Sequence, residues 1–236
     1  MKTVEGVNAL DVSRFDQDVS NFKRIMPSLL DKGLDNINLS MFDENTKKVV
    51  LSLLGDEYAR RGKLSDAMKA FVLSGNREKL VKIGEDYEIV GLFGNAIDAY
   101  RMANASEKLI ESGNKCLNEG RLQDSIKAFR ALNDPALLVK VGEACIKKNK
   151  WDYAVEVFAS INNREKLIEV GKRCLDDGQI GYAAKAFELA DDKEMLSVLG
   201  DTCMKQGLFA TALKSYQLAN NEMMVQFIKE NFGSKF

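Results

Sequence analysis

Apolar residues recur along the chain every three or four residues, the spacing that places them on one face of an α-helix. The stretches with this spacing come in pairs, and a glycine separates the two stretches of a pair. In one stretch Leu167, Val170 and Cys174 follow one another at intervals of three and four, which places them on one face of a helix. Gly178 ends this pattern, and a second apolar face starts at Ile180. The pattern therefore predicts two helices joined by a short turn.

This pair of stretches returns every 29 residues, which identifies an internal repeat. The period is marked by Gly55, Gly84, Gly113, Gly142, Gly171 and Gly200. An aromatic residue follows each glycine at a fixed distance, as Phe71, Tyr100, Phe129, Phe158, Phe187 and Tyr216. A small residue, Ala or Ser, stands four positions before each aromatic residue. These slots predict helical hairpins in which small residues permit close approach and the aromatic rings fill the remaining space.

Capping residues predict where the helices begin and end. Asn149 replaces the turn glycine in one unit, and asparagine is the usual substitute for glycine at a left-handed helix C-cap. Asp134 followed by Pro135 predicts an N-cap and the first residue of the next helix. The sequence Asp191-Asp192 is a capping signal at the equivalent junction.

The repeats divide the chain into three predicted parts. Residues 1–54 form an N-terminal helical cap, residues 55–228 form six hairpin repeats starting at the glycines, and residues 221–236 form a C-terminal helix and tail. Within the cap, residues 13–54 look like a degenerate repeat, in which Met26 replaces the glycine and Asn38 the small residue. Ser13, followed by Asp16, is expected to cap a preceding helix. Such atypical terminal units shield the core of a stack of repeats.

The repeated positions resemble the signature of the tetratricopeptide repeat in six or seven slots of each unit. In one unit they are Leu167, Val170, Gly171, Cys174, Ala183, Phe187 and Ala190. That family usually has a period of about 34 residues, and the shorter period here is also similar to the helical repeats of clathrin heavy chains. The resemblance implies an all-α, right-handed superhelical solenoid of antiparallel helical hairpins. It also implies a non-enzymatic scaffold that binds a peptide or helical segment of another protein.

In the tetratricopeptide family the first helices of the hairpins line the groove that binds partner segments. Two slots on the predicted first helices are mostly acidic, and Asn114 and Lys172 are non-acidic residues in the second of them. The residues of the candidate groove are Asp56, Glu78, Glu85, Glu107, Asn114, Glu143, Glu165, Lys172, Glu194 and Asp201. Glutamates in the first turn of a helix are also stabilised by the helix dipole, which accounts for one of the two slots without any partner. The other slot lies nearly two turns further along. The resemblance therefore predicts an acidic groove that favours a basic partner segment.

Charge and composition narrow the classes of function. The chain has 34 Lys and Arg against 35 Asp and Glu and contains no His, so the commonest general base and metal ligand is missing. Glycine-rich phosphate loops and clustered metal ligands are also missing, and we expect no enzyme activity, cofactor or metal. The four cysteines, Cys116, Cys145, Cys174 and Cys203, share one repeat slot. Neighbouring units are too far apart for disulfides, so buried free thiols are predicted.

Alternative functions remain open. The C-terminal helix carries an apolar set of residues between Met223 and Ile228, which favours either packing on the last hairpin or pairing with another chain. A self-assembling, coat-like structural solenoid is therefore the alternative to a peptide-binding scaffold. An RNA-binding repeat requires a basic face, and the acidic slots argue against nucleic acid as a partner. We also expect no membrane insertion and a cytoplasmic location, because no long apolar segment or leader pattern is found.

Overall fold

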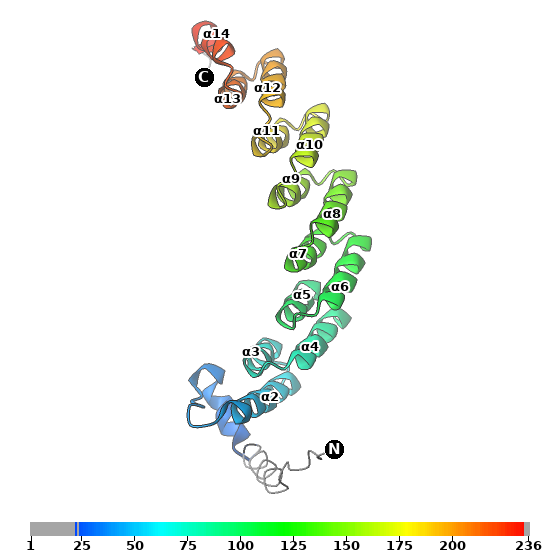
Figure 1. The fold of residues 1–236 in the computed structure, drawn as a ribbon, viewed down its shortest axis with the longest axis vertical. Coiled ribbons are helices and arrows are strands. Elements are labelled where there is room, and N and C mark those ends of the chain that lie inside the picture. Colours follow the sequence, from blue (N-terminus) through cyan, green and yellow to red (C-terminus); the bar gives the residue numbers. More distant parts are fainter. Residues whose placement is uncertain (1–21, 23, 234–236) are drawn as a thin grey trace, which may run out of the picture. The chain divides into compact units, whose positions relative to one another are not determined.

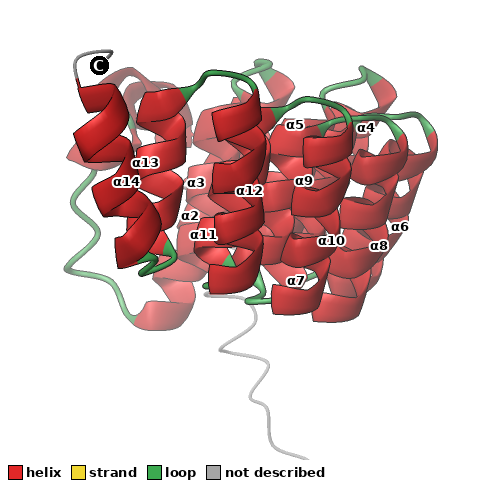
Figure 2. Ribbon diagram, turned by 90° about the horizontal axis from the view of Figure 1, so that it is seen from above, coloured by secondary structure: helices red, strands yellow, loops and turns green. Residues whose placement is uncertain are grey.

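The computed structural model describes Phe22 and residues 24–233. Throughout this part of the chain the secondary structure consists of helices joined by turns and loops, without strands (Figure 2). The all-α fold class predicted from the hydrophobic pattern is thereby confirmed.

The helices alternate between two positions of the repeat, which we call first and second helices. The first helices are α2 (Glu44–Arg60), α4 (Arg77–Ile89), α6 (Ser106–Asn118), α8 (Pro135–Lys147), α10 (Arg164–Asp176), α12 (Lys193–Lys205) and α14 (Glu222–Phe232). The second helices are α3 (Leu64–Ser74), α5 (Phe93–Met102), α7 (Leu122–Leu132), α9 (Trp151–Ser160), α11 (Ile180–Leu189) and α13 (Phe209–Leu218). From α4 onward, successive first helices begin 29 residues apart, as do all second helices. The predicted two helices per period are therefore confirmed.

The chain divides into two compact units, one ending at Ser112 and the other starting at Gly113, so the division falls inside α6. In the first unit α2 packs on α3, α3 on α4, and α4 on α5 (Figure 1). In the second unit each helix from α7 to α14 packs on the next one along the chain. In addition, α9 and α11, which are both second helices, lie in contact.

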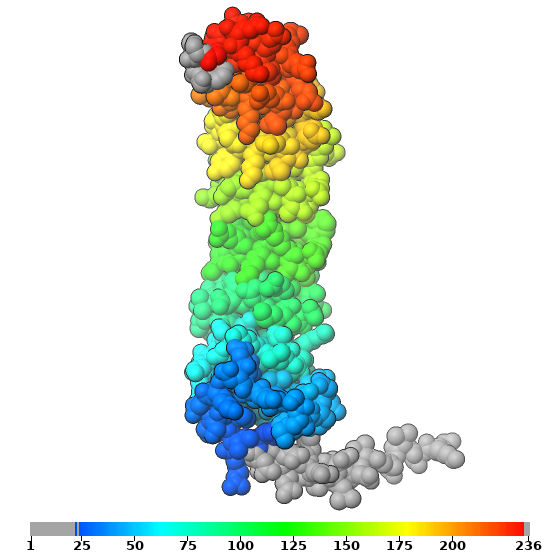
Figure 3. Space-filling view, turned by 90° about the vertical axis from the view of Figure 1, so that its left-hand side faces the viewer, coloured from blue at the N-terminus to red at the C-terminus, as the bar shows by residue number. Residues whose placement is uncertain are grey.

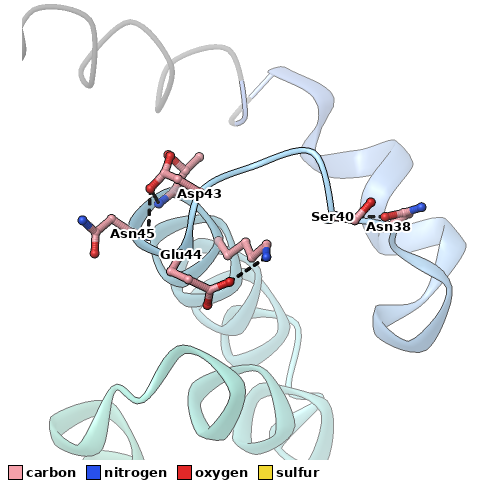
Figure 4. A network of polar contacts seen from close by, with 7 residues as sticks. Asn38, Ser40, Asp43, Glu44 and Asn45 are labelled. Atoms are coloured by element: carbon pink, nitrogen blue, oxygen red, sulfur yellow. Dashed lines mark hydrogen bonds and ion pairs between the residues drawn. The ribbon is translucent and has the colours of Figure 1, made fainter.

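The helix ends follow the predicted capping residues. The Asp134 carboxylate accepts hydrogen bonds from two backbone N–H groups of α8, and Asp192 accepts one from Met195. Asn149 has a φ of 53°, in the left-handed region, as predicted for a C-cap. At the start of α2, Asp43 accepts hydrogen bonds from the backbone N–H groups of Asn45 and Thr46 at 2.9 and 3.1 Å (Figure 4). Local sequence thus sets both ends of the hairpin helices.

The N-terminal segment departs from the hairpin pattern. Residues 24–32 are helical, but the next residues form only the short 3-10 helix η1 (Leu34–Asn36) and a loop that reaches Asp43. Phe22 and Phe42 hold this segment together, with ring centroids 5.2 Å apart in an edge-on arrangement. Ser13, the predicted cap, lies outside the described residues.

The core of each hairpin is built on contact between the marker glycine and the aromatic residue. Gly171 of α10 faces the ring of Phe187 of α11, and a Cβ atom at Gly171 would lie less than 3.0 Å from three ring carbons. The same close approach joins the other five marker glycines to their aromatic residues. All six aromatic side chains are at most 1% exposed. The glycine is therefore required because the ring occupies the space that a side chain would take.

Candidate functional site

In each of the two units the candidate site is the exposed face of the first helices, and we call these residues the first-helix face. On α4 it contains Glu78, Val81 and Glu85, whose spacing of three and four residues places them on the same side of the helix. Glu78 is exposed, and Val81 and Glu85 are half-buried. Equivalent triplets recur on the later first helices. They are Glu107, Ile110 and Asn114 on α6, Ala136, Val139 and Glu143 on α8, Glu165, Ile168 and Lys172 on α10, and Glu194, Ser197 and Asp201 on α12.

Three acidic residues of this face are paired with lysines of the following first helix. The pairs join Asp56 to Lys79 at 2.8 Å, Glu85 to Lys108 at 2.8 Å, and Glu143 to Lys166 at 2.9 Å. The hydrogen bond that the Lys108 ammonium group donates to the Glu85 carboxylate raises the pKa of Lys108. The hydrogen bond that Lys166 donates to Glu143 raises the pKa of Lys166 in the same way, and its hydrogen bond to Glu169 contributes further. Each pair links two successive hairpins and partly neutralises the acidic slot.

These lysines are the residues that sequence reasoning missed. Lys79, Lys108 and Lys166 occupy one repeat slot, directly after the first-turn glutamates, so the period contained a signal for them. What the period did not show is that their ammonium groups reach back to the carboxylates of the preceding first helix. Where these ion pairs occur, acidic and basic side chains of successive first helices alternate, and we call this arrangement the charge ladder. The acidic character of the face therefore comes from the first-turn glutamates.

The remaining predicted groove residues have varied surroundings. Asn114 accepts a hydrogen bond from the Lys140 ammonium group at 2.9 Å, and Asp201 accepts one from the Tyr216 hydroxyl group. Lys172 is exposed on α10. Glu78, Glu107, Glu165 and Glu194 are exposed in the first turns of their helices. These four glutamates are therefore accessible to a partner, as are the exposed side chains of Asp56 and Asp201.

The four cysteines are free thiols and are all buried, as predicted. Burial raises the pKa of Cys145 to about 11, with a smaller effect of the nearby Asp152 carboxylate, and burial likewise raises the pKa of Cys174 to about 11. A thiol with such a pKa is almost wholly protonated at neutral pH and is a poor nucleophile and a poor metal ligand. The cysteines therefore act as small apolar residues of the core.

These buried thiols predict a loss of stability at alkaline pH. The pKa of Cys145 and Cys174 is higher in the folded chain than the ordinary value of 9.0, so their contribution is fully present below pH 9. This contribution to the free energy of unfolding is lost as the pH rises through 11. Each unit of difference between the folded and the unfolded pKa corresponds to about 1.4 kcal/mol. Urea unfolding between pH 8 and pH 11 measures it. The double variant Cys145→Ala/Cys174→Ala should show a clearly flatter decline, and an unchanged slope would contradict the assignment.

Comparison with protein-family models gives no match for this chain, and no curated protein resembles it significantly in sequence. Within residues 24–233, every helix falls short of the length and apolar character needed to cross a bilayer.

Proposed function

We propose that this protein is a non-enzymatic scaffold for protein–protein interactions, built as a right-handed superhelical solenoid of tetratricopeptide-like hairpins. Its partner is a peptide or helical segment that lies along the first-helix face. The observation that carries this proposal is the recurrence, on the three first helices α4, α6 and α10, of an exposed first-turn glutamate followed three residues later by an aliphatic residue. Repeats of this kind present an extended surface made from equivalent local sites, which suits an extended partner.

The aliphatic and the acidic residues of this face have different roles in the proposed binding. Val81, Ile110, Val139 and Ile168 are partly exposed aliphatic side chains, and covering them provides apolar contact area. The first-turn glutamates are exposed and select the register of a segment that carries Lys or Arg. The ion pairs of the charge ladder connect each first helix to the next and so hold the neighbouring glutamates at a regular spacing. We therefore expect partner binding to weaken as salt concentration rises, because exposed charges are screened.

The test is a pull-down with the purified full chain from a lysate of the cells in which it occurs. The triple variant Glu78→Lys/Glu107→Lys/Glu165→Lys reverses three exposed glutamates of the first-helix face. We expect wild type to retain a small set of basic proteins at low salt and to release them at high salt. The triple variant should lose these proteins at both salt concentrations.

The matched control carries the same change in net charge at exposed positions away from this face. It is Glu119→Lys/Asp177→Lys/Glu188→Lys, with the substitutions in two inter-helix turns and on the second helix α11. The control should retain the same basic proteins as wild type. Equal loss in both variants would show a net-charge effect and would contradict recognition by the first-helix face.

Self-assembly is a second candidate function, favoured by the exposed apolar residues of α14. Met223 is 79% exposed and Phe227 is 45% exposed, and their spacing of four residues places them next to each other on one side of α14. Adjoining exposed apolar side chains are a feature of interaction surfaces. Multi-angle light scattering over a range of concentrations tests this function. Oligomers of wild type that disappear in Met223→Glu/Phe227→Glu would support it, whereas a monomer at all concentrations would reject it.

A cytoplasmic location is also part of the proposal. It is supported by the four free thiols, because reduced cysteines are kept in that state in reducing compartments.

A further inference from the structure

Two serine hydroxyl groups in the hairpin of α6 and α7 are buried without a hydrogen bond. Ser112 of α6 is 1% exposed and Ser125 of α7 is 0% exposed, and their Oγ atoms have no hydrogen-bond partner among the described residues. Such a group gives up its hydrogen bonds to water on folding and gains none within the protein, so its burial is costly. This hairpin is the third of the six repeats, and Figure 3 shows it in green.

The other repeats have apolar residues at both of these slots. The slot of Ser112 lies directly before the marker glycine, and its other residues, all buried, are Leu54, Ile83, Val141, Val170, Leu199 and Ile228. The slot of Ser125 lies four positions before the aromatic residue, and its other residues, all 0% exposed, are Ala67, Ala96, Ala154, Ala183 and Ala212. The hairpin geometry therefore accepts an apolar side chain at either position, and both polar replacements fall in the same hairpin.

Other buried serines of this chain show how a helix normally accommodates such a group. Ser215 of α13 is 3% exposed, and its hydroxyl group donates a hydrogen bond to the backbone carbonyl of Thr211 at 2.9 Å. A serine inside a helix commonly bonds to a carbonyl three or four residues earlier in this way. Neither Ser112 nor Ser125 makes this bond to the described backbone. The cost of burying these two hydroxyl groups is therefore not offset.

The unpaired hydroxyl groups lie at the point where the chain divides into its two compact units. The first unit ends at Ser112, and Ser125 belongs to the second unit. Proteins open locally in contiguous cooperative units, and the boundary of such a unit is where an opening begins. The hairpin that contains this boundary is thus also the one whose core carries two unsatisfied polar groups.

We propose that the α6–α7 hairpin is a conformational device, a point at which the chain opens locally while its other hairpins stay folded. In the open form the hydroxyl groups of Ser112 and Ser125 bond to water, so the penalty that they carry in the closed form disappears. This order of opening is opposite to the fraying from the ends that is usual in folded chains. The inference does not rest on the partner binding proposed for the first-helix face.

Hydrogen exchange of the full-length chain, followed by mass spectrometry, tests this proposal. The hairpin of α8 and α9 is the internal reference, because it is the next repeat and has Val141 and Ala154 at the two slots. We expect the backbone amides of α6 and α7 to exchange at least about tenfold faster than those of α8 and α9, after correction for intrinsic rates. Equal or slower exchange of α6 and α7 would overturn the proposal.

The double variant Ser112→Val/Ser125→Ala gives this hairpin the residues of the next repeat. Its α6 and α7 amides should exchange at least about tenfold more slowly than in wild type, because both unpaired hydroxyl groups are gone. The amides of α12 and α13 should keep their wild-type rates. Unchanged exchange in α6 and α7 would overturn the proposal, and so would equal slowing in every helix, because the chain would then open only as a whole.

A pair of single variants separates the missing hydrogen bond from the general effect of placing alanine in a helix. Ser125→Ala removes only an oxygen atom from the core, so it also serves if the double variant fails to fold. The matched control is Ser215→Ala, which removes a buried hydroxyl group that is bonded. It should change exchange in α13 by less than about threefold, the scale of the difference in helix propensity. If Ser215→Ala slowed α13 as much as Ser125→Ala slowed α7, helix propensity would explain both effects and the proposal would be rejected.

Discussion

Replacing Gly171 with alanine is expected to lower the free energy of unfolding by about 1–3 kcal/mol, although alanine is the better helix former. A Cβ atom at this position would lie less than 3.0 Å from three ring carbons of Phe187. The Phe187 side chain is 0% exposed, so its ring has no free space into which it can move. The substitution therefore forces the two helices of the hairpin apart. Urea unfolding of wild type and variant, followed by circular dichroism, measures the loss.

Gly181 of the same hairpin is the matched control. It lies in α11, and a Cβ atom there would meet nothing within 4 Å. Gly181→Ala is therefore expected to stabilise the chain by about 0.4–1 kcal/mol, because alanine restricts the unfolded chain and fits the helical backbone without strain. If both substitutions stabilised the chain, the close contact between Gly171 and Phe187 would be refuted.

Replacing Phe158 with alanine is expected to cost about 3–5 kcal/mol, the usual loss for a fully buried aromatic side chain. Phe158 of α9 is 0% exposed and lies against Gly142 of α8. The neighbouring glycine has no side chain that could relax into the space left by the ring, so a cavity remains. Thermal and urea unfolding measure the effect. Each hairpin in a repeat protein contacts only its neighbours, so the loss of stability should be local. We expect faster hydrogen exchange of the backbone amides of α8 and α9 than of the other helices.

Leu189 provides the corresponding control on a second helix. It is 48% exposed on α11, and Leu189→Ala should change the free energy of unfolding by less than about 0.5 kcal/mol. A loss below about 1 kcal/mol for Phe158→Ala would mean that the ring does not fill the space between α8 and α9.

Much of the hairpin architecture could be predicted from the sequence. Asp134, Asp192 and Asn149 mark helix ends through hydrogen bonds and dihedral angles that involve only a few neighbouring residues. The cysteines are buried and free, as the shared slot predicted. The cap was the harder part, because residues 34–43 hold a 3-10 helix and a loop where the hairpin repeats have a second helix.

The candidate site was predictable only in part. The ten groove residues follow from the repeat register, but their charge balance does not. Lys108 and Lys166 reach carboxylates on the preceding first helix, and no local pattern gives the length and direction of that reach.

The sequence by itself determined the helices, their period of 29 residues and the residues that form their core. It could do so because helix formation, capping and one-sided burial depend on spacings of three, four and seven residues. The tertiary structure alone decided which glycine touches which ring and which acidic side chains are paired with a lysine. These features depend on distances between side chains of different helices, and such distances are set by the packing of the hairpins.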